Sequence, residues 1–164
     1  MSANDFERRL RVLEDIEEIR KLKARYCAAC DDEHNPEKLG PLFAENAVWE
    51  ATGTGRAEGR EAIKALLGGI GRSGFIKNSG HHAINPIIEV DGDRATGHWR
   101  LIMLYTAYRR DRSLEYRRII GWYREKYVRL DGRWYFEHLY CEVEEHAPYV
   151  IGEADLGARA GATR

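Results

Sequence analysis

The chain has 164 residues, of which 43% are hydrophobic and 32% charged, which is enough apolar material for one core with an internal pocket but not for a second domain. Its 26 basic and 27 acidic side chains nearly balance, so we expect no basic surface that would draw it to nucleic acid or to an anionic membrane. The expected partners are a small-molecule substrate and further copies of the chain.

We expect no targeting signal in this sequence. No apolar run approaches the roughly 20 residues that span a bilayer, and residues 1–5 lack the basic end and the apolar stretch of a signal peptide. Three cysteines, an odd number, do not suggest a disulfide framework. These features predict a cytoplasmic protein that keeps its thiols reduced.

The first element predicted in chain order is an amphipathic helix over residues 5–32. Its apolar side chains recur every three or four positions, and they are Leu10, Leu13, Ile16, Ile19, Leu22 and Tyr26. One face of this helix is expected to be buried. Asn35 followed by Pro36 is typical of a helix start and predicts a short second helix that ends near Phe43.

The pattern then changes from helix to strand. Residues 47–51 predict a compact strand, three glycines interrupt the chain, and helical spacing resumes over residues 60–67. From His82 onward the sequence is typical of two β-hairpins, with turns at Asp91-Gly92-Asp93 and at Asp131-Gly132. The predicted strands of these hairpins cover residues 83–90, 95–108, 116–130 and 133–144.

This order of elements predicts an α+β fold. We expect N-terminal helices packed in a strongly curved antiparallel or mixed β-sheet that encloses a pocket, with alternate strand residues pointing inward. Residues 1–149 would form this single domain. The Gly- and Ala-rich residues 150–164 are expected to form a mobile tail or a lid.

The candidate catalytic residues are a phenol, a carboxylate and an imidazole. Tyr26 and Asp31 lie on the first predicted helix, about 140° apart around an ideal helix, so both reach one pocket only if the helix ends or bends between them. Asp32 is the alternative carboxylate. Neighbouring strand residues face opposite sides, so only one ring of the His81-His82 doublet enters the interior. The structural alternative for Tyr26 is a core residue whose hydroxyl is already hydrogen-bonded. For the histidine doublet, the alternative is a surface turn without a function.

Two local sequences, in the context of this element order, resemble a known family. The segment Arg-Lys-Leu-Lys-Ala-Arg-Tyr at residues 20–26 and the Asp-Gly-Arg-Trp hairpin at residues 131–134 are similar to the SnoaL-like branch of the NTF2-like superfamily, and the resemblance extends to about Tyr149. Within that branch the chain resembles bile-acid 7α-dehydratases most, and scytalone dehydratases and lindane dehydrochlorinases more distantly.

The resemblance implies roles for three residues and an assembly. The family's catalytic tyrosine, aspartate and histidine fall on Tyr26, Asp31 and His82, which makes Asp31 the preferred carboxylate and His82 the preferred ring. The outer faces of the long strands also carry Tyr and Ile residues among the charges, which predicts a homo-oligomer. The family resemblance favours a trimer over a dimer.

Aromatic and apolar side chains are expected to bind the substrate. Side chains alternate between the two faces of a strand, so every second residue of 95–108 is expected to point into the cavity. His138 is expected on the same strand face as Trp134, Phe136 and Tyr140. The candidate substrate-binding residues are Trp49, Trp99, Leu101, Met103, Tyr105, His138 and Tyr140. This lining favours a flat, apolar substrate that is aromatic or steroidal.

No cofactor or metal is expected. Cys27 and Cys30 have the spacing of a redox pair but no second pair to complete a zinc site, and we interpret both as buried small residues. The glycines lack the context of a dinucleotide or phosphate loop. No spacing of histidines and carboxylates resembles a metal triad.

These observations predict a cofactor-independent lyase of the dehydratase type. His82 would remove a proton, Asp31 would orient the ring, and Tyr26 would donate a hydrogen bond to the oxygen that gains charge. One alternative is a carbon–carbon lyase that releases formaldehyde from a lignin-derived phenolic diol. The others are a non-catalytic small-molecule-binding protein, expected if the three residues diverge, and the small subunit of a ring-hydroxylating dioxygenase.

Overall fold

The computed structural model describes residues 3–149, and the predicted tail at residues 150–164 lies outside them. The helices are α1 (Ala3–Asp31), α2 (Pro36–Leu39) and α3 (Arg60–Arg72), with a short 3-10 turn at Gly40–Leu42. The predicted helix start is confirmed, because the side chain of Asn35 accepts a hydrogen bond from the backbone N–H of Glu37 at 3.1 Å. The second helix is shorter than predicted.

Six strands form one mixed sheet that does not close. They are β1 (Phe43–Ala51), β2 (Gly55–Glu58), β3 (Ile76–Asp91), β4 (Arg94–Tyr108), β5 (Leu114–Leu130) and β6 (Arg133–Pro148). Their order is β2-β1-β6-β5-β4-β3, and only β1 and β6 are parallel. Strand β2 was not predicted, because it has only four residues and begins at one of the glycines that interrupt the chain. The predicted α+β architecture is confirmed.

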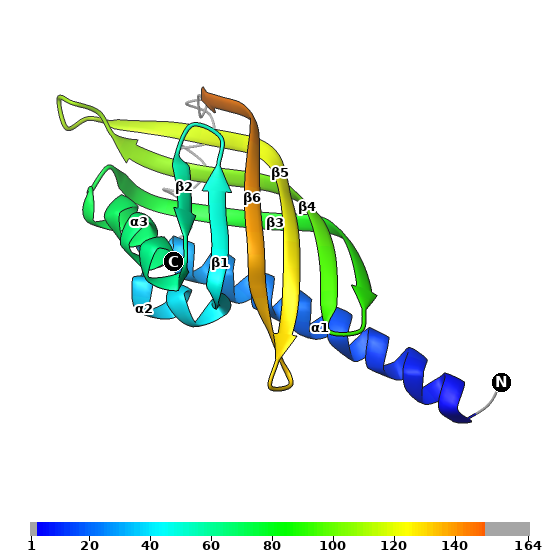
Figure 1. Cartoon of the computed structure of the whole chain (residues 1–164). Helices are drawn as coiled ribbons and strands as arrows, with labels where there is room; N and C mark the ends of the chain where they lie inside the picture. The colour runs from blue at the N-terminus through cyan, green and yellow to red at the C-terminus, as the bar shows by residue number, and fades with distance from the viewer. Residues whose placement is uncertain (1–2, 150–164) are drawn as a thin grey trace, which may run out of the picture.

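The sheet curves over α1, and α3 packs beside β1 and β2 (Figure 1). The C-terminal half of α1 buries its apolar face, where Ile19 and Leu22 are almost fully enclosed. The N-terminal half projects beyond the sheet, so Leu10 and Leu13 are 45% and 64% exposed. The prediction that one face of this helix is buried therefore holds only for its second half. No helix among residues 3–149 is both long and apolar enough to cross a membrane.

A β-bulge shifts the register of β6 against β5. Tyr127 pairs with Phe136 and Lys126 pairs with His138, so Glu137 is an extra residue on β6. One extra residue exchanges the two faces of a strand from that point onward. Beyond the bulge, Leu139 and Cys141 are therefore the buried residues of β6.

A buried polar chain ties α1 to the sheet. The Nζ atom of Lys23 lies 2.5 Å from Oε1 of Glu125 on β5, and both side chains are at most 1% exposed. Tyr127 donates its hydroxyl to the other carboxylate oxygen, and Trp99 donates its indole N–H to the Tyr127 oxygen at 3.0 Å. Lys23 also lies 3.0 Å from the centre of the Tyr123 ring. The buried charges are thus paired and hydrogen-bonded, as stability requires.

Candidate active site

Asp31 and His81 form a hydrogen-bonded pair between α1 and β3. Asp31 is the last residue of α1, and its Oδ1 atom lies 2.6 Å from Nδ1 of His81. The same carboxylate accepts the backbone N–H of His81 at 3.0 Å and the hydroxyl of Ser79 at 2.8 Å. The His81 side chain is 8% exposed. Three contacts from one strand therefore hold this carboxylate and fix the ring beside it.

The environment of Asp31 keeps its carboxylate ionised. Partial burial acts to raise the pKa of Asp31, but the hydrogen bonds from the His81 ring and backbone and from Ser79 outweigh it, and the pKa is lowered. With an ionised acceptor at Nδ1, the ring donates Nδ1–H to Asp31. Its Nε2 atom then carries the lone pair that a base needs.

The prediction that His82 is the interior ring is wrong, because His81 takes that place. Strand β3 begins at Ile76, so both histidines lie inside it. His81 pairs with Met103 and His82 pairs with Ile102. Met103 is 5% exposed and faces the interior, so the ring opposite it also faces inward, whereas His82 is exposed. Pairing with β4 decides which of the two rings is enclosed.

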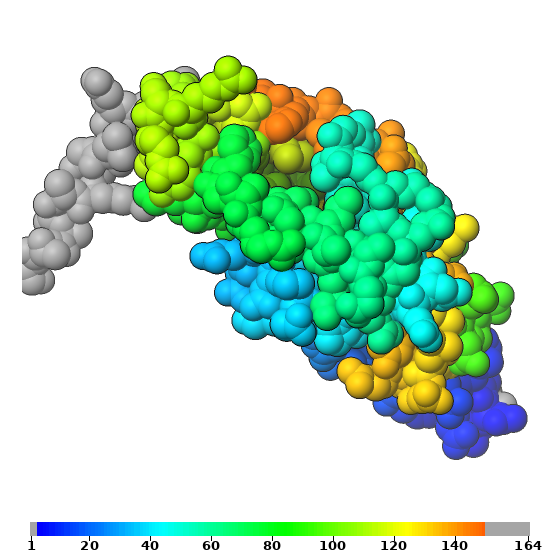
Figure 2. All heavy atoms as spheres, turned by 60° about the vertical axis from the view of Figure 1, so that its left-hand side comes forward, coloured from blue at the N-terminus to red at the C-terminus, as the bar shows by residue number. Residues whose placement is uncertain are grey.

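An apolar cavity of about 140 Å³ lies against the His81 ring. Its lining residues are Tyr26, His34, Trp49, Ala51, Thr54, Leu67, Ile70, Ile76, His81, Leu101, Met103, Ile119, Tyr123, Cys141 and Val143. Its mouth corresponds to the hollow between the end of α3, the β1–β2 turn and the end of β6, which is visible in Figure 2. A cavity of about this size holds one benzene ring.

Tyr26 contributes a protonated hydroxyl to this cavity. The hydroxyl oxygen accepts a hydrogen bond from Nε1 of Trp49 at 3.0 Å. Burial raises the pKa of Tyr26 well above its ordinary value, so the phenol keeps its proton and can donate it in a hydrogen bond. Asp31 does not line the cavity. Tyr26 and Asp31 therefore need not face the same side of α1. Asp31 contacts the His81 ring, and it is this ring that lines the cavity.

The predicted substrate-binding residues divide into three groups. Trp49, Leu101 and Met103 line the cavity. Trp99 and Tyr105 are buried but lie outside the lining: Trp99 contacts Tyr127, and the Tyr105 hydroxyl lies 2.6 Å from Nε2 of His146.

For His138 and Tyr140 the predicted placement is wrong. His138 lies 2.8 Å from the Glu50 carboxylate and the Tyr140 hydroxyl lies 3.4 Å from Thr52, both away from the cavity. The bulge at Glu137 is the cause, because it reverses the alternation that placed these residues on the inner face.

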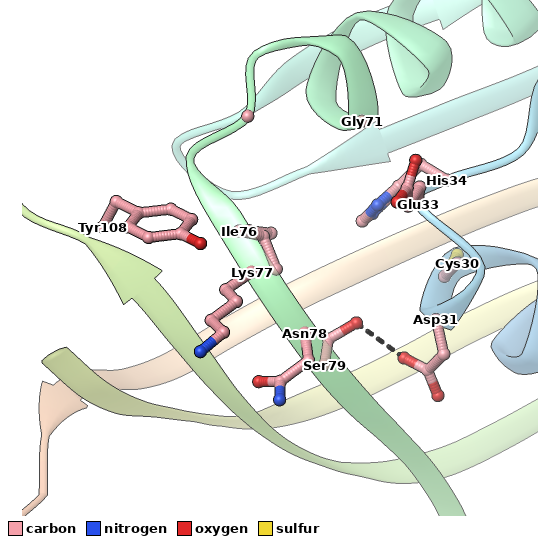
Figure 3. A pocket seen from close by; sticks show the side chains of 11 residues that line it. Cys30, Asp31, Glu33, His34, Gly71, Ile76, Lys77, Asn78, Ser79 and Tyr108 are labelled. Carbon is pink, nitrogen blue, oxygen red and sulfur yellow. Dashed lines mark hydrogen bonds between the residues drawn. The ribbon is translucent and has the colours of Figure 1, made fainter. Parts of the chain in front are cut away.

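A second, polar hollow of about 260 Å³ adjoins the cavity. Figure 3 shows Asp31 and Ser79 joined across its lower part, and His34 facing Ile76 across its upper part. Lys77, Asn78 and Tyr108 also line it. His34 and Ile76 belong to both linings and so separate the inner cavity from this outer hollow.

Sequence reasoning missed His34. The residue follows α1 and is 7% exposed, and its ring centre lies 5.9 Å from that of His81. Burial lowers the pKa of His34 to about 4, and His81 acts in the same direction. Nothing in the local pattern distinguishes a histidine that precedes a helix cap from a surface residue, so no sequence signal could have found it.

Cys30, His34 and His81 are the group in the described chain whose side chains best approach a metal site. Their ligand atoms lie within 4.8 Å of one another. Zinc bonds of about 2.0–2.3 Å would require these atoms to approach one another closely and the Cys30 thiol to ionise. Without an ion, burial raises the pKa of that thiol, and the group then consists of neutral hydrogen-bonding side chains. Cys27 and Cys30 are buried and unpaired, as expected.

Solved structures share this fold. A candidate scytalone dehydratase from Novosphingobium aromaticivorans DSM 12444 is 26% identical, with a TM-score of 0.72 over 85% of this chain and 91% of its own. An NTF2-like protein with a cystatin-like fold from the same species is also 26% identical, with a TM-score of 0.71 over 96% of both chains.

A further structural match is the hexachlorocyclohexane dehydrochlorinase LinA-type3 from Novosphingobium barchaimii LL02, which is 21% identical, with a TM-score of 0.75 over 86% of this chain and 94% of its own. No curated protein matches the sequence at a significant level. The sequence profile of the SnoaL-like domain matches residues 11–140, most of the chain. The protein therefore belongs to the SnoaL-like domain family of the NTF2-like superfamily.

Proposed function

We propose that this protein is a cofactor-independent lyase that acts on a small aromatic hydroxy compound. The observation that carries the proposal is the Asp31–His81 pair at the wall of an apolar cavity. A hydrogen-bonded carboxylate and imidazole beside an apolar cavity supply a base without a metal. The cavity volume of about 140 Å³ favours a substrate with one ring, because a steroid nucleus would extend well beyond it.

Each group in the site has one task. Nε2 of His81 removes a proton from a carbon next to a carbonyl, or from a phenol, while Asp31 holds the ring tautomer and stabilises the imidazolium that forms. Tyr26 donates its hydroxyl hydrogen bond to the oxygen that gains negative charge. The removed proton then leaves with the departing hydroxide as water.

The structural relatives support elimination chemistry. Two of them carry the names dehydratase and dehydrochlorinase, which denote loss of water and of hydrogen chloride. The meeting of Asp31 and His81 within hydrogen-bond distance favours catalysis over simple ligand binding. Loss of formaldehyde from a phenolic diol starts with the same proton removal and is the second candidate reaction. The closer likeness to bile-acid dehydratases stays a prediction.

The test is a screen followed by two matched variants. Small phenolic and steroid alcohols are incubated with the protein without added cofactor, and loss of water or formaldehyde is measured by mass spectrometry. For the compound that reacts, His81→Gln should lower turnover by about 10²- to 10⁴-fold. His82→Gln makes the same change one residue away on the exposed face and should leave turnover unchanged.

Two results would contradict the proposal. An equal loss of turnover in His82→Gln would place the base elsewhere. Loss of turnover after dialysis against a chelator, with recovery only on addition of a divalent metal, would show that the reaction needs an ion that the proposed mechanism does not use.

A further inference from the structure

His34 is a buried polar side chain without a hydrogen-bond partner for its ring among the described residues. It is 7% exposed, and its contact in the site is the edge of the His81 ring, 5.9 Å away between ring centres. No fully buried side-chain nitrogen or oxygen among the described residues lacks a hydrogen bond, so the unpaired ring nitrogen of His34 is open to a cavity and not enclosed by protein. Its ring lines both the inner cavity and the outer hollow, so a bound ligand is the partner within reach.

The backbone around His34 is held in an unusual conformation. Glu33 and His34 have φ angles of 55° and 52°, in the left-handed region that non-glycine residues rarely adopt. On the side of α1, a hydrogen bond from the backbone N–H of His34 to the Cys30 carbonyl oxygen, 3.1 Å long, holds the turn. On the opposite side, α3 packs closely against the turn. A Cβ atom on Gly71 would lie only 1.8 Å from the Glu33 carbonyl oxygen, so only glycine fits there. Strain that the surrounding structure enforces in this way is concentrated at functional sites.

The chemistry of this ring suits a ligand oxygen. Because burial lowers the pKa of His34 to about 4, the ring stays uncharged at neutral pH and offers one N–H donor and one acceptor. The titratable side chains that face it are Cys30, Asp31 and His81. An uncharged imidazole can polarise a substrate oxygen by donating a hydrogen bond, as a neutral histidine does in triosephosphate isomerase.

We infer that His34 is a substrate-binding residue whose ring N–H donates a hydrogen bond to an oxygen substituent on the substrate's aromatic ring. The ring of the substrate would occupy the apolar cavity, and the oxygen would lie at the junction with the outer hollow, where His34 and Ile76 meet. Further polar substituents would extend toward Lys77 and Asn78 (Figure 3). This inference rests on the proposed function only in taking this cavity as the substrate site.

The test compares two probes that differ by one hydroxyl group, 4-methylphenol and toluene. Dissociation constants for both are measured by NMR titration with the wild type, His34→Leu and His34→Asn. The preference for the phenol, expressed as the ratio of the two constants, should fall about 2- to 10-fold in His34→Leu, the equivalent of one net hydrogen bond. His34→Asn keeps an N–H donor and tolerates the positive φ, so it should retain part of the preference.

Two measurements keep the test independent of folding defects. His98→Leu removes an exposed histidine of β4 and should leave the ratio unchanged, and melting temperatures are recorded for every variant. In the wild type, the ring ¹⁵N resonances of His34 should move on addition of 4-methylphenol and not on addition of toluene.

The outcomes separate this inference from the proposed function. A ratio that is unchanged in His34→Leu, or a failure of the wild type to bind either probe, overturns the inference, even if turnover depends on His81. A ratio that depends on His34 upholds it, even if no screened compound reacts, and in that case the lyase proposal fails alone.

Discussion

At the scale of single residues, the site depends on which of two chemically identical neighbours faces inward. His81 and His82 have the same side chain, but His81 lies 2.6 Å from Asp31 and lines the cavity, whereas His82 is exposed. This difference in environment comes from the strand register. The same carboxylate holds both the His81 ring and its backbone, so Asp31 is a positioning residue for the proposed base.

His34 makes stability depend on pH in a defined window. Its folded pKa of about 4 lies below the ordinary value of about 6.5, so between these values the unfolded chain binds the extra proton. The free energy of unfolding should therefore decrease as pH falls from about 6.5 to 4, by roughly 3 kcal/mol from this residue, and level off below. Urea unfolding at pH 7, 5.5 and 4 measures it.

The variant His34→Asn isolates this contribution. Other groups titrate in the same window, and His146, whose pKa burial also lowers, remains in both proteins. The wild type should lose more stability than His34→Asn between pH 7 and 4. Asp31 acts at lower pH, because its lowered pKa gives a contribution that is complete above about 4 and is lost as pH falls further. Parallel pH curves for the two proteins would contradict the low pKa of His34.

At the scale of elements, the end of α3 supports the turn that carries His34. Gly71→Ala would place a methyl group 1.8 Å from the Glu33 carbonyl oxygen, so the helix and the turn must separate, at a cost of about 1–3 kcal/mol or more. Gly69→Ala on the same helix meets no atom within 4 Å and should stabilise by up to about 1 kcal/mol. Thermal unfolding of the two variants should thus shift in opposite directions, and a shared direction would refute the close packing.

The buried Lys23–Glu125 pair is one of two ion pairs that link α1 to β5, and Asp15–Arg129 is the other. Glu125→Gln leaves the Lys23 ammonium without its counter-charge inside the core, and we expect a loss of about 3–5 kcal/mol of unfolding free energy. Glu18→Gln removes the carboxylate of an exposed pair with Lys21 on the same helix and should have no measurable effect. Denaturant unfolding compares them. Equal stability of the two variants would mean that the buried pair contributes nothing beyond its surface counterpart.

At the scale of the whole molecule, exposed apolar side chains favour assembly. On β3, β4 and β5, the residues Ile84, Ile87, Leu104 and Tyr116 are between 38% and 65% exposed, more than a solitary domain usually presents in one sheet. We therefore predict a homo-oligomer with cyclic symmetry, and the family resemblance favours a trimer. Light scattering at micromolar protein checks this: the mass of one 18.9 kDa chain would refute assembly, and twice that mass would refute the trimer alone.

Local patterns in the sequence predicted most of the elements and the chemistry of the candidate site. Helical spacing up to Tyr26, the Asn35 cap and the turns at Gly92 and Gly132 are local signals, because capping and periodicity depend on residues a few positions apart. The helices and long strands they predicted are present. The residue types of the acid–base set were also readable, since a carboxylate and an imidazole suffice to define that chemistry.

Which side chains come together in the candidate site depends on the tertiary structure. Pairing with β4 selected His81 over His82, and the extra Glu137 turned His138 outward, because a shift of one residue exchanges the faces of a strand. His34 entered the site through a turn held by the distant Gly71. The volume of the cavity likewise depends on packing between elements far apart in the chain. Such relations belong to pairs of distant residues, so no local pattern in the sequence encodes them.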